Sequence, residues 1–134
     1  MANTIATQVL VDGPTTTIVK VTILGDSSGE ETNTVIFDAS AYTPAATLTR
    51  LKKIIYTTVG AAAVLSWDAT ANVTLMGLPA DVSDTLCFYD DSGLPNNGGA
   101  GRTGDILITT SGLGSGDLIT MVLYVEKLNP PVIR

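Results

Sequence analysis

The sequence has no histidine, one cysteine and few aromatic residues: its 134 residues include one Trp, four Tyr and two Phe. Histidine is the commonest general base and a frequent metal ligand, so its absence removes the usual partner of a nucleophilic serine or cysteine. The single cysteine, Cys87, allows no disulfide within the chain and suits a reducing compartment. These absences disfavour an enzyme that works by nucleophilic catalysis.

Positive charge and long apolar runs are also scarce. Seven Lys and Arg stand against thirteen Asp and Glu, which gives a net charge of −6 and a pI near 4.2. Nucleic-acid binding requires a basic surface, so we expect no nucleic-acid partner. The apolar runs are shorter than the roughly 18 residues that cross a bilayer, and the first residues lack the pattern of a signal peptide. We expect no membrane partner, and synthesis in the cytoplasm of the host cell.

Short β-strands separated by turn residues dominate the chain. Twenty Thr and many Val supply β-branched side chains, which favour strands, and thirteen Gly mark turns. The pattern predicts strands at residues 5–11, 16–24, 34–37, 51–58, 62–67, 72–76, 85–89, 105–110 and 117–127. No internal repeat or linker divides them, so we expect one domain over residues 1–134, with extended termini at about 1–4 and 128–134. The spacing indicates an all-β fold, an antiparallel β-sandwich of about eight or nine short strands arranged like a jelly roll.

Two segments depart from simple strand alternation. The last predicted strand, residues 117–127, has apolar residues on both faces, which indicates a central strand or one covered by a neighbour. Thr43 is a good helix cap and Pro44 suits a first helical position, so a short turn of helix is predicted near Pro44.

Residues 99–104 (GAGRTG) match the spelling of the dinucleotide-binding motif G-x-G-x-x-G. That motif works between a strand and a helix, because the helix N-terminus meets the pyrophosphate. Here a loop precedes the motif and a predicted strand follows it, and the chain contains no Gly-Lys-Ser/Thr phosphate loop. We interpret the motif as a turned surface loop and expect no cofactor.

Acidic and amide side chains raise two further possibilities, a metal site and a pair of catalytic carboxylates. The oxygen-bearing residues between positions 90 and 105 are of the kind that calcium binds: Asp90, Asp91, Ser92, Asn96, Asn97 and Asp105. Their spacing does not match an EF-hand, and Asp and Asn beside Gly are ordinary turn formers. The sequence also selects no pair among its acidic residues as general acid and base. We therefore expect no metal site and no enzymatic activity, and a calcium-dependent loop stays open as the alternative.

Three remaining features have a structural and a functional interpretation. Trp67 ends an apolar run, so we expect a buried ring rather than a sugar-stacking platform. Cys87 lies between Leu86 and Phe88, and we expect it to be a small core residue. The basic residues at positions 50, 52 and 53, of which the first and second should share one strand face, form either an ordinary polar face or a contact for an acidic partner.

Four ordered stretches of the chain resemble small structural proteins of tailed bacteriophages. They are residues 8–14 (QVLVDGP), 25–32 (GDSSGEET), 65–70 (LSWDAT) and 93–106 (GLPNNGGAGRTGDI). The likeness covers nearly the whole chain, and it consists of short sequence segments rather than a catalytic motif. The resemblance implies a non-enzymatic virion component, a capsid decoration (cement) protein that binds the outside of the shell and stabilises it.

The resemblance also implies a jelly-roll or β-sandwich fold, a homotrimer at local three-fold positions, the major capsid protein as partner, and a place on the capsid surface of the virion. For the contacts we expect residues from both ends of the chain: Thr4, Ile5, Gln8, Val132, Ile133 and Arg134. A tail, baseplate or fibre component acting as a receptor- or glycan-binding module stays open as the alternative.

Overall fold

The computed structural model describes residues 3–13, 15–26, 29–41, 49–88, 94–95, 101 and 103–127. These residues form ten β-strands and one 3-10 helix. The elements are β1 (Thr4–Asp12), β2 (Thr16–Leu24), β3 (Thr34–Phe37), η1 (Ala39–Ala41), β4 (Thr49–Val59), β5 (Ala62–Trp67), β6 (Val73–Leu78), β7 (Ser83–Cys87), β8 (Leu94–Pro95), β9 (Ile106–Ser111) and β10 (Leu118–Lys127). No helix among the described residues is long and apolar enough to cross a membrane.

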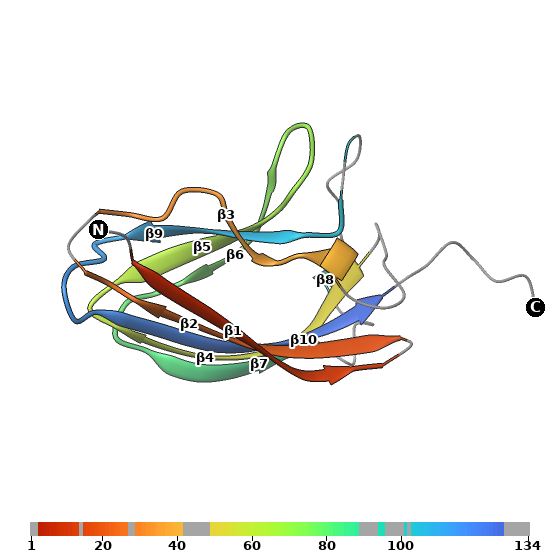
Figure 1. Ribbon diagram of the computed structural model, residues 1–134, viewed down its shortest axis with the longest axis horizontal. Coiled ribbons are helices and arrows are strands. Elements are labelled where there is room, and N and C mark those ends of the chain that lie inside the picture. The colour runs from red at the N-terminus through yellow and green to blue at the C-terminus, as the bar shows by residue number, and fades with distance from the viewer. Residues whose placement is uncertain are drawn as a thin grey trace, which may run out of the picture.

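The strands form two antiparallel sheets that pack face to face, as the two layers of Figure 1 show. One sheet has six strands in the order β1-β2-β10-β4-β7, with β8 paired to β4, and the other has four in the order β3-β9-β5-β6. The pairs are nested along the chain, because β5 pairs with β6, β4 with β7, β3 with β9 and β2 with β10. A long hairpin rolled into two sheets in this way is a jelly roll, so the expected fold class is confirmed.

Alternating side chains of both sheets fill the space between the layers. In β2 and β10 every second residue is buried, as the two-residue period of a strand requires. The largest fully buried side chains include Trp67, Phe37, Ile54, Leu65, Ile108, Met121 and Leu123. Each buried side chain of this size contributes roughly 1.5–3 kcal/mol of burial free energy, so the core can hold the fold without disulfide or metal. The predicted burial of Trp67, which is 1% exposed, is confirmed.

The predicted strands correspond to β1 to β7, β9 and β10, with ends displaced by no more than two residues. The last strand is central, as expected, because β10 lies between β2 and β4. The short strand β8 and the 3-10 helix η1 were not predicted, and the expected turn of helix near Pro44 lies outside the described residues.

The prediction that Cys87 belongs to the core is wrong, because the residue is exposed. Cys87 ends the edge strand β7 opposite Lys53, on the outer side of the sheet, whereas its neighbour Leu86 lies opposite the fully buried Ile54. An apolar sequence context could not reveal that Cys87 faces the outer side of the sheet, which no described element covers.

The expected alternation along β4 is interrupted by a β-bulge. Leu51 and Ile54 are both fully buried although they are three residues apart, because the register with β10 shifts between Tyr124 and Val125. Lys53 lies opposite the outward residue Tyr124, and its ammonium stands 5.2 Å from the centre of that ring. The bulge therefore adds Lys53 to the outer face of the sheet.

Candidate functional site

The edge strand β1 is the most exposed regular element of the described chain. It pairs with β2 alone among the described strands, and its side chains are exposed except for Ile5, which is half-buried. Thr7 and Val9 lie opposite the buried residues Val21 and Val19, and so face the inner side of the sheet, yet both are exposed. The four-stranded sheet thus leaves the inner side of β1 uncovered around Thr7 and Val9.

Three consecutive apolar side chains make this edge unusual. Val9, Leu10 and Val11 are 49%, 47% and 45% exposed, and a register shift leaves Leu10 as an extra residue between the other two. No residue from Thr4 to Val11 is charged. Natural edge strands are commonly protected against pairing by charges or prolines, and β1 has neither over this length. β1 is therefore a surface on which another chain can pair or pack.

The other edge strand of the same sheet, β7, has a charged side chain. The Oδ1 atom of Asp84 accepts a hydrogen bond from the backbone nitrogen of Thr85 at 2.7 Å. A carboxylate on an edge strand discourages pairing with a further strand. Asp84 is the second of the five residues of β7, whereas the one charged residue of β1, Asp12, is its last and pairs with Lys127, so β1 has the longer uncharged edge.

The structure locates three of the six expected contact residues, and all three belong to β1. Thr4 and Gln8 are exposed and share the outer side of the sheet with their partners Leu24 and Lys20, while Ile5 packs against the core. Thr4 is thus the first residue of a strand rather than part of an extended terminus. Val132, Ile133 and Arg134 lie outside the described residues.

The outer face of the six-stranded sheet is a second candidate surface, and no described element covers it. Side chains of β2, β10 and β4 line up across it in rows given by the strand register. At one end the row Leu24, Leu118 and Val59 is apolar, with Leu24 44% and Val59 48% exposed. Further rows contain Thr22, Thr120 and Thr57, then Lys20, Val122 and Ile55, then Ile18, Tyr124 and Lys53. A solvent-facing sheet face is usually polar, so these apolar side chains indicate a contact surface.

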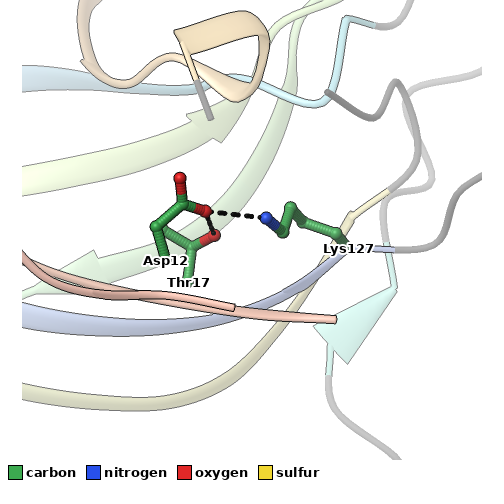
Figure 2. Close-up of polar contacts among 3 residues, drawn as sticks. All are labelled: Asp12, Thr17 and Lys127. Atoms are coloured by element: carbon green, nitrogen blue, oxygen red, sulfur yellow. Dashed lines mark hydrogen bonds and ion pairs between the residues drawn. The ribbon is translucent and has the colours of Figure 1, made fainter. Parts of the chain in front are cut away.

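An ion pair with a buried lysine joins the end of β10 to the end of β1 (Figure 2). The Nζ atom of Lys127 lies 2.8 Å from the Oδ1 atom of Asp12, and the Lys127 side chain is fully buried. The hydroxyl of Thr17 donates to the same carboxylate oxygen at 3.4 Å. The backbone nitrogen of Lys127 donates to the carbonyl oxygen of Thr15 at 2.7 Å. The last residue of β10, from which the expected C-terminal contact segment departs, is thereby fixed against the β1–β2 turn.

The end of the glycine-rich motif has a structural role. Gly101 has a φ of +76°, and a Cβ atom there would collide with the Thr70 side chain. The Thr103 hydroxyl donates to Asp68 Oδ2 at 2.9 Å, so the segment is bonded to the loop that follows β5. The strand β9 begins directly afterwards, at Ile106. A strand in place of a helix N-terminus lacks the phosphate-binding element of the dinucleotide motif.

Asp105 joins two other acidic residues at this end of the four-stranded sheet. Its Oδ1 atom accepts a hydrogen bond from the backbone nitrogen of Ala39 at 2.8 Å. Partial burial raises the pKa of Asp105 above its ordinary value, and the nearby charges of Asp38 and Asp68 raise it further, against the opposing effect of that hydrogen bond. No group of three or more potential metal ligands occurs among the described residues, which include Asp105 but not the five other expected oxygen donors.

At the opposite end of the sandwich, Glu30 holds the β9–β10 turn. Its carboxylate accepts hydrogen bonds from the Thr110 hydroxyl at 2.7 Å, from the Gly112 nitrogen at 2.9 Å and from the Leu113 nitrogen at 3.1 Å. The Thr110 bond and then the Leu113 bond hold the pKa of Glu30 below its ordinary value. Nearby, the Asn3 side chain donates to Glu31 at 2.7 Å and so fixes the start of β1. These acidic side chains organise turns.

Sequence reasoning identified part of these surfaces and missed part. It selected residues of β1, and it noted that the last strand is apolar on both faces. It did not identify Val9, Leu10 and Val11 as the exposed part of β1, because strand order decides which strand lies at an edge. The rows of side chains on the outer face could not be predicted either, because they depend on the register of three strands that are far apart in sequence.

No family model matches the chain, and no curated protein matches it. Among solved structures, it is similar to a cupin domain from Bordetella pertussis Tohama I, at 11% identity and a TM-score of 0.41, over 96% of this chain and 98% of that chain. It is also similar to a cupin superfamily protein from Desulfitobacterium hafniense DCB-2, at 11% identity and a TM-score of 0.35, over 96% of this chain and 82% of that chain.

Proposed function

We propose that this protein is a non-enzymatic structural protein of a tailed-phage virion, which binds the outside of the capsid as a decoration protein and stabilises the shell. The observation that carries the proposal is the edge of β1, which has no charge or proline from Thr4 to Val11 and leaves Val9, Leu10 and Val11 about half exposed. Such an edge suits a protein whose task is to attach to a preformed surface. The resemblance to small phage structural proteins suggests that this preformed surface is the outside of a phage capsid.

Attachment through β1 requires no chemistry, only shape and exposed contact groups. A partner strand can pair along the free edge, and the apolar side chains of residues 9–11 can enter pockets beside it. The core anchors β1 through Ile5 and the Asp12–Lys127 ion pair, so the edge is held ready before binding. A pre-ordered contact loses less conformational entropy when it binds.

Shell stabilisation follows from binding the assembled shell alone. A ligand that binds one state and not the other stabilises the bound state by mass action, whatever the affinity of a single contact. A homotrimer that engages three equivalent sites of the major capsid protein gains avidity without new contacts. The net charge of −6 keeps free copies apart before they attach.

The test is attachment to undecorated shells, measured by co-sedimentation. Leu10→Lys places a charge on the exposed edge and should reduce attachment strongly, while the unfolding free energy changes by no more than about 0.5 kcal/mol. Val64→Lys is the matched control, because Val64 is 40% exposed on the other sheet and gains the same charge. A chain that ends at Lys127 tests the expected contacts of Val132, Ile133 and Arg134. If the Leu10→Lys variant and the shortened chain both occupy shells normally, these contact assignments fail.

The alternative, a receptor- or glycan-binding module, finds no specific support in the described residues. Trp67, the single tryptophan, is buried and offers no platform for a sugar ring. Binding of the purified protein to host cells or glycans, with and without calcium, would favour that alternative.

A further inference from the structure

The outer face of the six-stranded sheet collects most of the positive charge of an acidic protein. Four of the seven basic residues of the chain belong to two strands of this sheet: Lys20 to β2, and Arg50, Lys52 and Lys53 to β4. Lys20, Arg50 and Lys53 occupy outward register positions, and Lys52 lies half-exposed at the bulge between them. Among the described residues, Glu126, opposite Arg50, is the acidic residue of this face. Counted over the described residues, the face is therefore basic, although the whole chain has a net charge of −6.

The same face is also apolar enough to be buried. Lys20 lies in a row with Val122 and Ile55, and Lys53 in a row with Tyr124 and Ile18. The apolar row that contains Leu24 closes one end. Apolar side chains interspersed with a few charges are typical of a surface that binds another protein, with the charges selecting the partner.

We propose that this face binds a second copy of the chain, and that it contacts part of the acidic remaining surface of that copy rather than the equivalent face. Two copies that met through this face would place their lysines against each other, which like-charge repulsion disfavours. The remaining surface of each copy is strongly acidic. Apart from Glu126, the described acidic residues lie outside this face, either on the edge strands β1 and β7 or in turns and loops. Charge complementarity thus selects a head-to-tail contact between copies.

A head-to-tail contact uses two different surfaces of each copy, so it closes into a ring when the rotation allows. This inference deepens the proposed function and rests on it for the homotrimer, since a ring of three copies presents three β1 edges to the shell. Leu24 and Val59 of each copy would then be covered by the neighbouring copy.

The experiment measures particle mass in solution by light scattering behind a sizing column, with no capsid present. At low salt we expect a mass near three times 13.9 kDa, which falls toward 13.9 kDa as salt screens the contact. Replacing both outward lysines (Lys20→Gln and Lys53→Gln) should weaken self-association by about tenfold or more. A protein that is monomeric at every salt concentration would overturn the inference.

A matched control separates the local effect from the change in net charge. Thr74→Glu with Ser111→Glu lowers the net charge by the same two units, at exposed positions of the four-stranded sheet. These two substitutions add charge of the sign that the basic face attracts, so they should not lower the mass, and equal weakening by both double variants would contradict the inference. Capsid binding is measured separately: a monomer that still binds shells refutes the inference alone, and a trimer that binds no shell refutes the proposed function alone.

Discussion

The ammonium of Lys127 lies 2.8 Å from the carboxylate of Asp12; the Lys127 side chain is fully buried and the Asp12 side chain is 30% exposed. The contact joins the last residue of β10 to the last residue of β1, although β2 lies between these strands in the sheet. A charge removed from water needs such a partner, because an uncompensated buried ammonium is strongly unfavourable. The pair therefore fixes the end of the exposed strand to the centre of the sheet.

Removing the charge of Asp12 should lower the unfolding free energy more than replacing Lys127 does. Asp12→Asn removes the negative charge and leaves a buried cation, with an expected loss of about 1–3 kcal/mol of unfolding free energy. Lys127→Met removes the charge that must be compensated and keeps a long apolar side chain, so we expect a smaller loss. Urea unfolding of both variants measures the difference. A larger loss for Lys127→Met would show that the buried charge is not what makes the pair important.

The Glu30 carboxylate should make the protein more stable at neutral than at acid pH. Its pKa in the folded protein is lowered from the ordinary 4.5, because the Thr110 hydroxyl and the backbone of Leu113 bond its charged form. This contribution is complete above the unfolded pKa and is lost as pH falls through the folded value. The stability difference between wild type and Glu30→Gln should therefore shrink as pH decreases below about 4.5. Thermal unfolding across pH measures it, and a difference that grows toward acid pH would refute the assigned role.

Asp105 should have the opposite pH dependence. Partial burial and then the charges of Asp38 and Asp68 raise its folded pKa above the ordinary 3.8, so its ionised form opposes folding. Asp105→Asn removes that charge and keeps an oxygen that can accept from the Ala39 nitrogen. We expect the variant to be more stable than wild type at pH 7 by up to about 0.5 kcal/mol, and the gain to vanish below the ordinary pKa. Denaturant unfolding at pH 7 and at acid pH tests this, and a variant less stable than wild type at pH 7 contradicts it.

Gly101 should be required for folding rather than for phosphate binding. Its φ of +76° disfavours any side chain, and a Cβ atom would meet Thr70. Gly101→Ala should therefore lower the unfolding free energy by about 1–2 kcal/mol. Gly77→Ala is the control, because a Cβ there meets nothing within 4 Å, and a neutral or slightly stabilising effect is expected. Equal effects of the two substitutions on the thermal midpoint would contradict the assignment.

The strand positions could be predicted because each strand combines β-branched residues with a clear turn at its end. Residues 16–24 show this well: Val19, Val21 and Ile23 alternate with Lys20 and Thr22, and the structure buries the first three. The central position of β10 followed from its apolar residues on both faces. The local sequence pattern was sufficient to predict these strands, because a strand on a core buries every second side chain and the sequence shows that alternation directly.

Which residues form the exposed surfaces depends on the pairing of strands far apart in the chain, and the local sequence pattern carries no information on that pairing. Cys87 has an apolar context, but it lies at an edge opposite Lys53 and is exposed. Asp38, Asp68 and Asp105 end or precede three different strands, and strand order brings their charges together. Val9 and Val19 have similar sequence surroundings, yet the first is about half exposed and the second is buried.

The most direct test of the central claim is co-sedimentation of the purified protein with assembled, undecorated phage capsids and, separately, with unassembled major capsid protein. We expect saturable binding to the shells and none to the free subunits, together with a higher temperature of shell disruption. A protein that stays in the supernatant at every concentration, at low salt as well as high, would contradict the proposed role in capsid decoration.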